Sequence, residues 1–379
     1  MLPGSLSYFG GSKESGSSPK GRREKAQVYK APRGTTDILP AEQPYWRYVE
    51  AQVAALCQAY GYQRIDTPMF EDAGIFERGI GQASDIVEKE MYTFPDRSGD
   101  QMTLRPEGTA PVCRAYLEHG MSQWPQPVRL YYIAPAFRYE RPQAGRFRQH
   151  HQFGVEALGE ADPALDAEVI SMAWELCLRL GLRDVNLELN SIGCTQCRPG
   201  YVAELRAYFS GHVERLCPDC RSRLERNPLR LLDCKQPGCQ AVAEQAPRSL
   251  DHLCSDCRGH FDKLRGYLVA LDFPYHLNHR LVRGLDYYTR TVFEVQPLIE
   301  GAQSTLAGGG RYDGLIEALG GRPTPGVGFA AGIERIILNL KRAGIAVPAP
   351  GPPQVYVAHL GPEAKQQALL LAEVLRRQG

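Results

Sequence analysis

Four arginines lie close together in one stretch of the chain, FRYERPQAGRFRQHHQFGVE, which spans residues 137–156. They are Arg138, Arg141, Arg146 and Arg148. Pro142 and Gly145 lie between them and favour a turn, so the stretch predicts a hairpin. Arginine guanidinium groups bind phosphate and carboxylate groups through paired hydrogen bonds. The composition therefore favours a hairpin that binds a phosphate-bearing ligand.

The returning strand of this hairpin should present polar side chains on one face, because alternate residues of a strand share a face. His150, Gln152 and Glu156 fall on that face, whereas Phe153 falls on the opposite one. A solvated outer face is the ordinary alternative, since charged residues usually lie in water. Solvated strands tend to carry Lys, Glu or Thr, and the mid-strand Gly154 indicates that something approaches the backbone closely. A ligand site is therefore favoured.

Other segments could also face a ligand. AGGGRYDGL (residues 307–315) has three consecutive glycines, which allow a ligand to approach the backbone, but it could also be a turn before a helix. It lacks the Gly-Lys-Ser/Thr of a P-loop, and GVGFAAG (residues 326–332) lacks the spacing of a dinucleotide fingerprint. Tyr287 and Tyr288 could form a ligand wall or pack within a strand pair. Glu107 could simply lie near a helix start.

Eight of the eleven cysteines form four pairs in one region of the chain. They are Cys194 and Cys197, Cys217 and Cys220, Cys234 and Cys239, and Cys254 and Cys257. Three pairs have the two-residue spacing that presents both thiolates to one tetrahedral metal ion, and eight thiolates would serve one or two Zn²⁺ sites. Their clustering favours reduced cytosolic thiols or a metal site over the disulfide framework of a secreted protein, and their spacing favours zinc over free thiols or disulfides.

A sheet with covering helices must position these residues. Alternating or β-rich segments predict strands over residues 101–109, 126–140, 146–159, 185–193 and 290–297. Apolar residues at helical spacing predict helices over residues 41–62, Ala110–His119 and Leu165–Leu180. Helices mixed with several non-repeating strands indicate an α+β domain with a largely antiparallel sheet.

Changes of composition divide the chain into segments. The predicted order is a disordered extension (1–28), a first part of the core (29–193), a helical Cys-rich insertion (194–267), a second part of the core (268–343), a Pro- and Gly-rich linker (344–353) and the start of an α/β domain (354–379). The last segment is predicted from a strand over 354–360 and a following helix, which cannot close a core alone. The chain is therefore expected to end inside that domain.

The net charge of the chain is close to zero, at +1, so any attraction for nucleic acid must come from local basic patches. No apolar run approaches the roughly 20 residues needed to cross a bilayer. The N-terminal segment lacks the apolar stretch of a secretory signal, and Glu14 and Glu24 weaken the alternative of a transit peptide. A cytoplasmic protein without membrane contact is expected.

Five motifs resemble those of the bacterial type of histidyl-tRNA synthetase, a family of class II aminoacyl-tRNA synthetases. FRYERPQAGRFRQ resembles motif 2, GVGFAAGIERI resembles motif 3, LRPEGTAP resembles the amino-acid-binding loop, and LVRGLDYYTRTVFE and AGGGRYDGL resemble two segments peculiar to the family. The resemblance implies a class II antiparallel-sheet core with helices, a helical insertion and a truncated C-terminal α/β anticodon-binding domain.

The implied reaction joins L-histidine to ATP as histidyl-adenylate and then transfers the histidyl group to the 3′ end of tRNA(His), with ATP and Mg²⁺ as cofactors. Fixed cations near the α-phosphate would stabilise the charge that develops there. By motif position, the catalytic residues would be Arg283 and Arg138. The ATP-binding residues would be Arg138, Glu140, Arg146 and Arg335. Histidine would contact Glu107, Gly108, Thr109, Gln152, Glu156, Tyr287 and Tyr288.

The resemblance also implies a homodimer that pairs through motif 1, expected within Pro32–Pro68. A pocket that hydrogen-bonds its substrate would select histidine without an editing domain. Many family members keep the insertion with other residues at the cysteine positions, so any zinc would be structural. The arginines of the insertion either touch the acceptor arm of tRNA or lie on a solvated helix. They are Arg215, Arg221, Arg223, Arg226 and Arg230.

Two alternatives stay open at this point. A histidyl-synthetase-like regulatory subunit of ATP phosphoribosyltransferase would resemble the core and lack the anticodon-binding domain. Arg283, the complete motif 2 and the insertion favour the synthetase instead. A nucleic-acid-binding module with a zinc ribbon would explain the cysteines, but it would give no role to motif 2 or to the LRPEGTAP loop.

Overall fold

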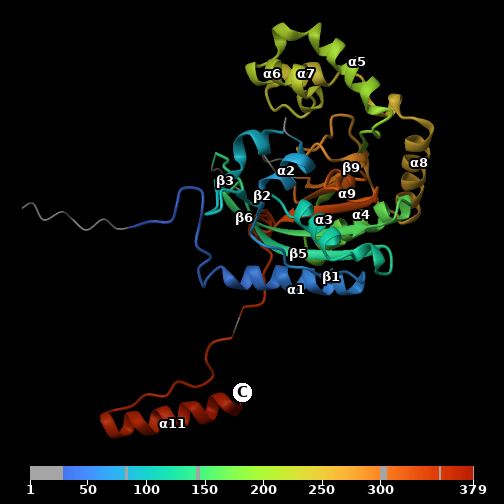
Figure 1. Ribbon diagram of the computed structural model, residues 1–379. Helices are drawn as coiled ribbons and strands as arrows, with labels where there is room; N and C mark the ends of the chain where they lie inside the picture. The colour runs from blue at the N-terminus through green and yellow to red at the C-terminus, as the bar shows by residue number, and fades with distance from the viewer. Residues whose placement is uncertain (1–28, 82–83, 142–145, 299–304, 350, 379) are drawn as a thin grey trace, which may run out of the picture.

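The computed structural model describes residues 29–81, 84–141, 146–298, 305–349 and 351–378. Its centre is an eight-stranded sheet with the strand order β1-β5-β6-β11-β10-β9-β7-β8 (Figure 1). The strands are β1 (Gln63–Arg64), β5 (Val128–Phe137), β6 (Gln149–Leu158), β7 (Val185–Ser191), β8 (His276–Leu277), β9 (Thr289–Pro297), β10 (Ala307–Arg311) and β11 (Gly326–Gly332). Among the described strands, the two edge pairs, β1 with β5 and β7 with β8, are parallel and the other pairs of this sheet are antiparallel. The prediction of an α+β domain with a largely antiparallel sheet is confirmed.

One face of the sheet packs against long helices in a continuous apolar core. The helices are α1 (Gln43–Ala59), α4 (Pro163–Arg179), α8 (Ser255–Ala270) and α10 (Ile333–Arg342). Trp46 and Val53 of α1 are buried in this core, so the helical pattern predicted for residues 41–62 is confirmed with tighter limits. Phe153 of β6 is buried on the same face, as the alternation of that strand predicts.

The other face packs against smaller elements in a second apolar core. They are α2 (Ala73–Ile80), α3 (Thr109–Glu118), α9 (Leu315–Ala318), the π-helix η1 (Ile86–Glu90) and the 3₁₀ turn η2 (Met121–Gln123). A three-stranded sheet of β2 (Phe70–Asp72), β4 (Gln101–Leu104) and β3 (Tyr92–Pro95) contacts α2. The strand predicted over 101–109 ends at Leu104, because the chain then turns into α3.

The arginine-rich stretch forms an antiparallel pair, β5 with β6, in which Phe137 lies opposite Gln149. The strands predicted over 126–140 and 146–159 are therefore confirmed with shorter bounds. Arg138 continues the pairing, since its backbone N–H donates to the carbonyl of Arg148 at 2.8 Å. Pro142 and Gly145, on which the predicted turn depends, lie outside the described residues, as does the extension predicted over residues 1–28.

A group of short helices lies between β7 and α8, at the top of Figure 1. They are α5 (Arg198–Ser210), η3 (Val213–Arg215), α6 (Pro218–Arg226), η4 (Pro228–Leu231), α7 (Pro237–Ala243) and η5 (Ser249–His252). Their apolar side chains, including Tyr201, Phe209 and Leu231, belong to the same core cluster as α3 and the adjacent sheet face. The insertion is therefore packed against the sheet domain.

The C-terminal segment differs from its prediction. Residues 354–360 form no strand, and α11 (Pro362–Gln378) has no buried residue. Figure 1 shows α11 apart from the sheet domain. The strand prediction is wrong because a strand needs a partner edge, and none of the described strands pairs with these residues. None of the described helices is long and apolar enough to span a membrane.

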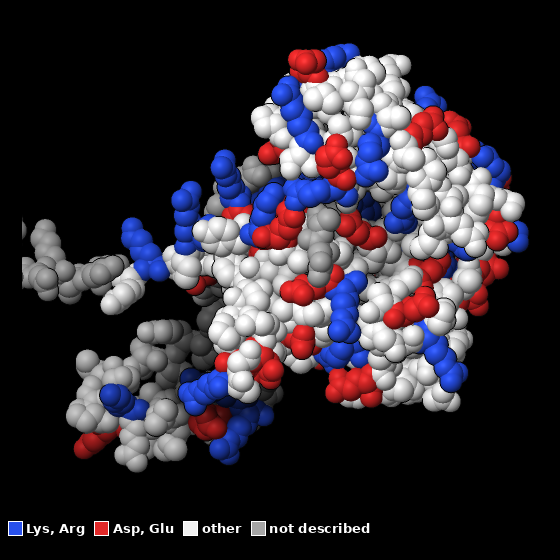
Figure 2. Space-filling view, turned by 45° about the horizontal axis from the view of Figure 1, so that its top comes forward, with Lys and Arg blue, Asp and Glu red and all other residues white. Residues whose placement is uncertain are grey.

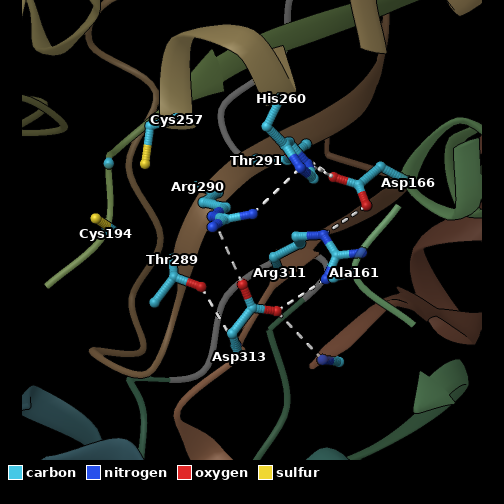
Figure 3. Close-up of polar contacts among 12 residues, drawn as sticks. Ala161, Asp166, Cys194, Cys257, His260, Thr289, Arg290, Thr291, Arg311 and Asp313 are labelled. Carbon is cyan, nitrogen blue, oxygen red and sulfur yellow. Dashed lines mark hydrogen bonds and ion pairs between the residues drawn. The ribbon is translucent and has the colours of Figure 1, made fainter. Parts of the chain in front are cut away.

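A buried ionic network joins α4, α8, β9 and β10 (Figure 3). The Asp166 carboxylate accepts from Arg311 Nε at 2.7 Å, from Thr291 Oγ1 at 2.6 Å and from His260 Nε2 at 2.8 Å. Arg311 also contacts Asp313 at 2.8 Å. The side chains of Asp166 and Arg311 are fully buried, so each depends on the other for compensation of its charge.

Candidate active site

A cleft of about 1570 Å³ lies between the sheet, the β5–β6 hairpin and the insertion. Gln152 of β6, Gly308 of β10 and Gly328 of β11 line it from the sheet, and Arg223 and Arg226 of α6 line it from the insertion. Figure 2 turns the insertion toward the viewer and shows Lys and Arg side chains interleaved with Asp and Glu, not a continuous basic surface. Cationic groups that act on a ligand here must therefore be concentrated inside the cleft.

At one end of the cleft, Glu107 closes the turn that starts α3. Its carboxylate accepts from the backbone N–H groups of Thr109 and Ala110 at 2.7 and 2.9 Å, and from Tyr287 Oη at 3.4 Å. The helix-start alternative for Glu107 is therefore confirmed, although the residue also lines the cleft. Burial raises the pKa of this carboxyl, and the two backbone N–H groups oppose the shift.

Gln152 projects from β6 into the same end of the cleft. Its Oε1 is buried and has no hydrogen-bond partner among the described residues. Burying an amide oxygen without a hydrogen-bond partner costs about 1–3 kcal/mol, so a ligand that donates a hydrogen bond to Oε1 would recover that energy. Tyr287 and Tyr288 stand nearby with ring centroids 4.8 Å apart, and both line the cleft. The arrangement suits a small ligand with an ammonium group and an aromatic ring.

Glu156 lies one layer behind the cleft and is 1% exposed. It accepts from Thr109 Oγ1 at 2.7 Å, from Tyr132 Oη at 3.4 Å and from Tyr312 Oη. Thr109 and Tyr312 line the cleft, whereas Glu156 itself does not. The hydroxyl groups of Thr109 and Tyr312 therefore lie between Glu156 and the cleft. Because they donate to the Glu156 carboxylate, their oxygen atoms could accept hydrogen bonds from a ligand.

The Glu156 carboxyl is expected to make stability depend on pH. Burial raises its pKa to about 8, from 4.5, although three hydroxyl donors oppose the shift. Between these two pKa values the folded protein retains a proton that the unfolded chain has released, so the free energy of unfolding falls as pH rises. Glu156→Gln should flatten this fall by up to about 1.4 kcal/mol per pH unit, measured by urea unfolding from about pH 5 to about pH 8.

Glu118→Gln is the matched control, since it removes a carboxylate at the surface that pairs with Arg114. Parallel pH profiles for wild type and Glu156→Gln would contradict the assignment of the buried proton to Glu156.

Two glycines leave the space that the ring of Tyr132 occupies. A Cβ atom on either Gly154 or Gly108 would collide with the ring of Tyr132. A Cβ atom on Gly328 would collide with the Glu156 carboxylate. The close approach expected at Gly154 is therefore that of a tyrosine, which in turn supports Glu156. Gly108 shapes the pocket from behind and does not line the cleft.

The hairpin arginines Arg138 and Arg146 line the cleft next to the Glu107 turn. Arg138 donates from Nε to the carbonyl of Pro106 at 2.8 Å, and Arg146 pairs with Glu140 at 3.0 Å. Arg335 of α10 also lines the cleft. His150 lies among these cations, and burial with the charges of Arg138 and Arg335 lowers its pKa to about 3. The imidazole is therefore neutral and adds no charge to the site.

Arg283 reaches the cleft from the irregular segment between β8 and β9. One Nη atom pairs with Glu294 of β9, and its guanidinium lies 5.8 Å from the ring centroid of Tyr288. Its Nε is buried without a hydrogen-bond partner among the described residues. A Cβ atom on Gly308 would lie 2.6 Å from Arg283 Nη1, so this glycine makes room for the guanidinium. Arg283 thus has a fixed position and a donor left for a ligand.

The structure brings most of the predicted site residues together. Those that line the cleft are Glu107, Thr109, Arg138, Glu140, Arg146, Gln152, Arg283, Tyr287, Tyr288 and Arg335. Sequence reasoning missed the supporting residues Tyr132, Tyr312, Glu294 and Gly308. Tyr312 and Gly308 belong to AGGGRYDGL, where the three glycines were the available signal, and Glu294 ends the segment LVRGLDYYTRTVFE, whereas Tyr132 had no signal beyond strand alternation.

Several arginines of the insertion are engaged within the molecule. Arg223 pairs with Asp85 at 2.7 Å, and Arg226 pairs with Glu88 of η1. Asn227 adds a hydrogen bond to Asp286 at 2.8 Å. These contacts hold the insertion over the cleft, so part of its basic charge serves docking between the two parts of the molecule.

Comparison with known proteins agrees with this geometry. The family described as Histidyl-tRNA synthetase matches residues 34–197 and 222–336. A histidine-tRNA ligase of Dehalococcoides mccartyi is 62% identical over 352 residues, which cover 93% of this chain and 84% of that protein. The crystal structure of apo histidyl-tRNA synthetase from S. aureus is 40% identical with a TM-score of 0.75, and the match covers 93% of this chain and 84% of that one.

A protein of Bacillus halodurans described as an ATP phosphoribosyltransferase regulatory subunit/histidyl-tRNA synthetase also has this fold. Its TM-score is 0.65 at 23% identity, with 94% of this chain and 92% of that one covered. That level of identity shows a shared fold and no more. The family match and the 62% identical relative together show that the chain belongs to the histidyl-tRNA synthetase family.

Proposed function

We infer that this protein is an aminoacyl-tRNA ligase that activates L-histidine with ATP to histidyl-adenylate and transfers the histidyl group to the 3′ end of tRNA(His). The observation that carries this inference is the cleft itself. It brings polar groups, among them Gln152 and Glu107, together with the cations Arg138 and Arg283. An amino acid and a nucleoside triphosphate could therefore meet within one cleft.

In this proposal the polar groups hold histidine. Glu107, Thr109 and Gln152 would receive the ammonium group, with Tyr287 and Tyr288 beside the ring. Glu156 would act on the imidazole through the hydroxyl groups in front of it, and Gly108 would keep the space behind Thr109 open. Unpaired polar groups in such a pocket cost about 1–3 kcal/mol each, which disfavours amino acids that lack matching donors and acceptors.

The cations would hold ATP. Arg138 and Arg283 would contact the α-phosphate from opposite sides and stabilise the negative charge that builds on its oxygens when the histidine carboxylate attacks. Arg146 and Arg335 would bind the terminal phosphates, and Glu140 would lie near the adenine. No proton transfer by the protein is needed in this step, because the attacking carboxylate is already ionised and pyrophosphate leaves as an anion.

ATP would enter as its Mg²⁺ complex. Glu90 and Glu140 line the cleft beside the phosphate-binding arginines. Burial raises the pKa of Glu90, and the neighbouring Glu140 carboxylate raises it further, so a cation there would relieve the repulsion. Carboxylate oxygens are among the ligands that Mg²⁺ takes from proteins, and Glu90 would supply one, whereas Glu140 would face the adenine.

Further parts of the proposal concern assembly and location. The protein would act in the cytoplasm as a homodimer that pairs through the Pro32–Pro68 region. Residues 29–193 and 268–343 would form the catalytic domain, residues 194–267 an inserted domain, and residues 354–379, after the linker at 344–353, the start of an anticodon-binding domain. The chain spans 84% of the relative from Dehalococcoides mccartyi.

Histidine-dependent exchange of pyrophosphate into ATP tests the function directly. We expect exchange with histidine alone, and none with the other nineteen amino acids. A folded chain that binds histidine without catalysing exchange would favour the regulatory-subunit alternative. Charging of tRNA(His), measured in parallel, would separate the second reaction step from the first.

A further inference from the structure

Eight cysteines of the insertion gather in two separate groups of four. We name Cys194, Cys197, Cys254 and Cys257 the root cluster, and Cys217, Cys220, Cys234 and Cys239 the tip cluster. Within each cluster the four sulfur atoms lie within 4.8 Å of one another. The first cysteine pair of the sequence therefore meets the fourth, and the second meets the third.

The sulfur spacing of the root cluster is that of a tetrahedral zinc site. Four sulfur atoms at about 2.3 Å from a zinc ion, at the corners of a tetrahedron, lie about 3.8 Å apart. Cys194 Sγ lies 3.8 Å from Cys197 Sγ and 3.9 Å from Cys254 Sγ, and Cys197 Sγ lies 3.8 Å from Cys257 Sγ. These separations are nearly twice the roughly 2.05 Å of a disulfide bond.

Backbone geometry around the root cluster also suits thiolate ligands. The N–H groups of Cys194 and Gln196 point at the sulfur atoms of Cys197 and Cys194 at 3.2 and 3.4 Å. Such donors orient metal-bound thiolates and offset their negative charge. Gly193 has a φ of +70°, and a Cβ atom there would lie 2.7 Å from Cys197 Sγ. The chain is therefore shaped to bring this sulfur inward.

The tip cluster repeats these features in another part of the insertion. Cys217 Sγ lies 3.9 Å from Cys234 Sγ, and the backbone N–H of Cys217 points at Cys239 Sγ at 3.2 Å. Cys220 and Cys239 are buried. The other cysteines of the chain, Cys57, Cys113 and Cys177, are buried in the apolar cores and belong to neither cluster.

We propose that the root cluster and the tip cluster each bind one structural Zn²⁺ ion, so that every chain carries two. This inference concerns the insertion and goes beyond the proposed reaction, in which neither ion takes part. Each site is closed by four protein ligands, which is the mark of a structural site, because a catalytic zinc ion keeps one position for water or substrate.

The root ion would hold together the two points at which the chain enters and leaves the insertion. Cys194 and Cys197 follow β7, whereas Cys254 and Cys257 begin α8. Figure 3 shows Cys194 and Cys257 beside the buried network, in which His260 of α8 contacts Asp166. The backbone N–H of Arg290 donates to the carbonyl of Gly193 at 2.8 Å. The root site therefore rests on the rigid core.

The tip ion would fix the helices that lie over the cleft. Cys217 and Cys220 lie at the start of α6, the helix that carries Arg223 and its ion pair with Asp85. Cys217 and Cys234 line the cleft themselves. Loss of this ion should loosen the contact between α6 and the segment around Asp85, while the root of the insertion stays in place.

Zinc content of the purified protein tests the proposal. The chain should be produced without a histidine tag, kept reduced and passed over a chelating resin before elemental analysis. We expect two zinc ions per chain in the wild type, and one in each of the variants Cys194→Ser/Cys254→Ser and Cys217→Ser/Cys234→Ser. Cys57→Ala is the matched control, because it removes a cysteine that belongs to neither cluster, and it should retain both ions.

A second measurement needs no variant to fold. Titration of the wild type with a mercurial thiol reagent, in the presence of a coloured zinc indicator, should release two zinc ions as eight thiols react. Replacement of zinc by Co²⁺ should give the intense visible absorption of tetrahedral cobalt thiolates. Fewer than two zinc ions per chain, eleven thiols that react without metal release, or a mass that reveals disulfides would overturn the proposal.

Discussion

Replacement of Arg283 by alanine is expected to slow histidyl-adenylate formation by about 10²–10³-fold without loss of the fold. The guanidinium is held beside the cleft by Glu294 and Tyr288, and its buried Nε has no partner among the described residues. Negative charge that develops on a phosphate oxygen would be stabilised by a donor that is already in position. No free energy is therefore spent on reorienting the guanidinium during the reaction. Histidine-dependent pyrophosphate exchange measures the rate, and a thermal melt checks the fold.

Two further variants make this prediction specific. Arg265→Ala removes a surface arginine of α8 whose nearest acidic partner, Asp262, lies 3.7 Å away, and it should leave the exchange rate unchanged. Gly308→Ala keeps the Arg283 charge but adds an atom 2.6 Å from Nη1, so it should reproduce part of the loss. Near-normal exchange by Arg283→Ala would remove Arg283 from the catalytic residues.

Replacement of Asp166 by asparagine is expected to lower the free energy of unfolding by about 3–5 kcal/mol. The substitution leaves the fully buried Arg311 guanidinium without the carboxylate that compensates its charge. It also weakens the hydrogen bonds from Thr291 and His260 that tie β9 and α8 to α4. Urea unfolding, with wild type and variant compared at the same pH, measures the loss.

The control for this prediction lies on the same helix. Glu168 of α4 pairs with Arg129 at 3.1 Å, and both side chains are partly exposed to solvent. Because solvent-exposed ion pairs contribute about 0–1 kcal/mol, Glu168→Gln should have a small effect. If the two variants lost equal stability, the buried network would not be the main connection between α4 and the sheet.

The two faces of β6 could be predicted from residue order, because alternation in a strand is a geometric necessity. Phe153 packs in the core and Gln152 lines the cleft, as the pattern indicates. The helical period over α1 was predictable for the same reason. Both features follow from the periodicity of a single strand or helix, so a short stretch of sequence is enough to predict them.

Features that depend on tertiary contacts could not be predicted. Asp166 lies in a helical pattern, where a single carboxylate is typical of a surface position, and only the fold shows Arg311 opposite it. Which cysteine pairs share a cluster depends on contacts between segments 60 residues apart in the sequence. The spacing of the cysteines was therefore compatible with either one or two zinc sites. The strand predicted over 354–360 failed because β propensity alone does not supply a partner edge.

The glycines around the pocket limit how its specificity could evolve. Every substitution at Gly154, Gly108 or Gly328 adds atoms, and each would collide with Tyr132 or Glu156. At Gly108 and Gly154 a compensating change would have to shrink Tyr132, and that would remove its hydrogen bond to Glu156. At Gly328 a Cβ atom would also meet the backbone carbonyl of Val155, so a smaller residue at position 156 would not make enough room. Single mutations therefore cannot reshape this region gradually, so a lineage could alter the pocket only through several changes at once.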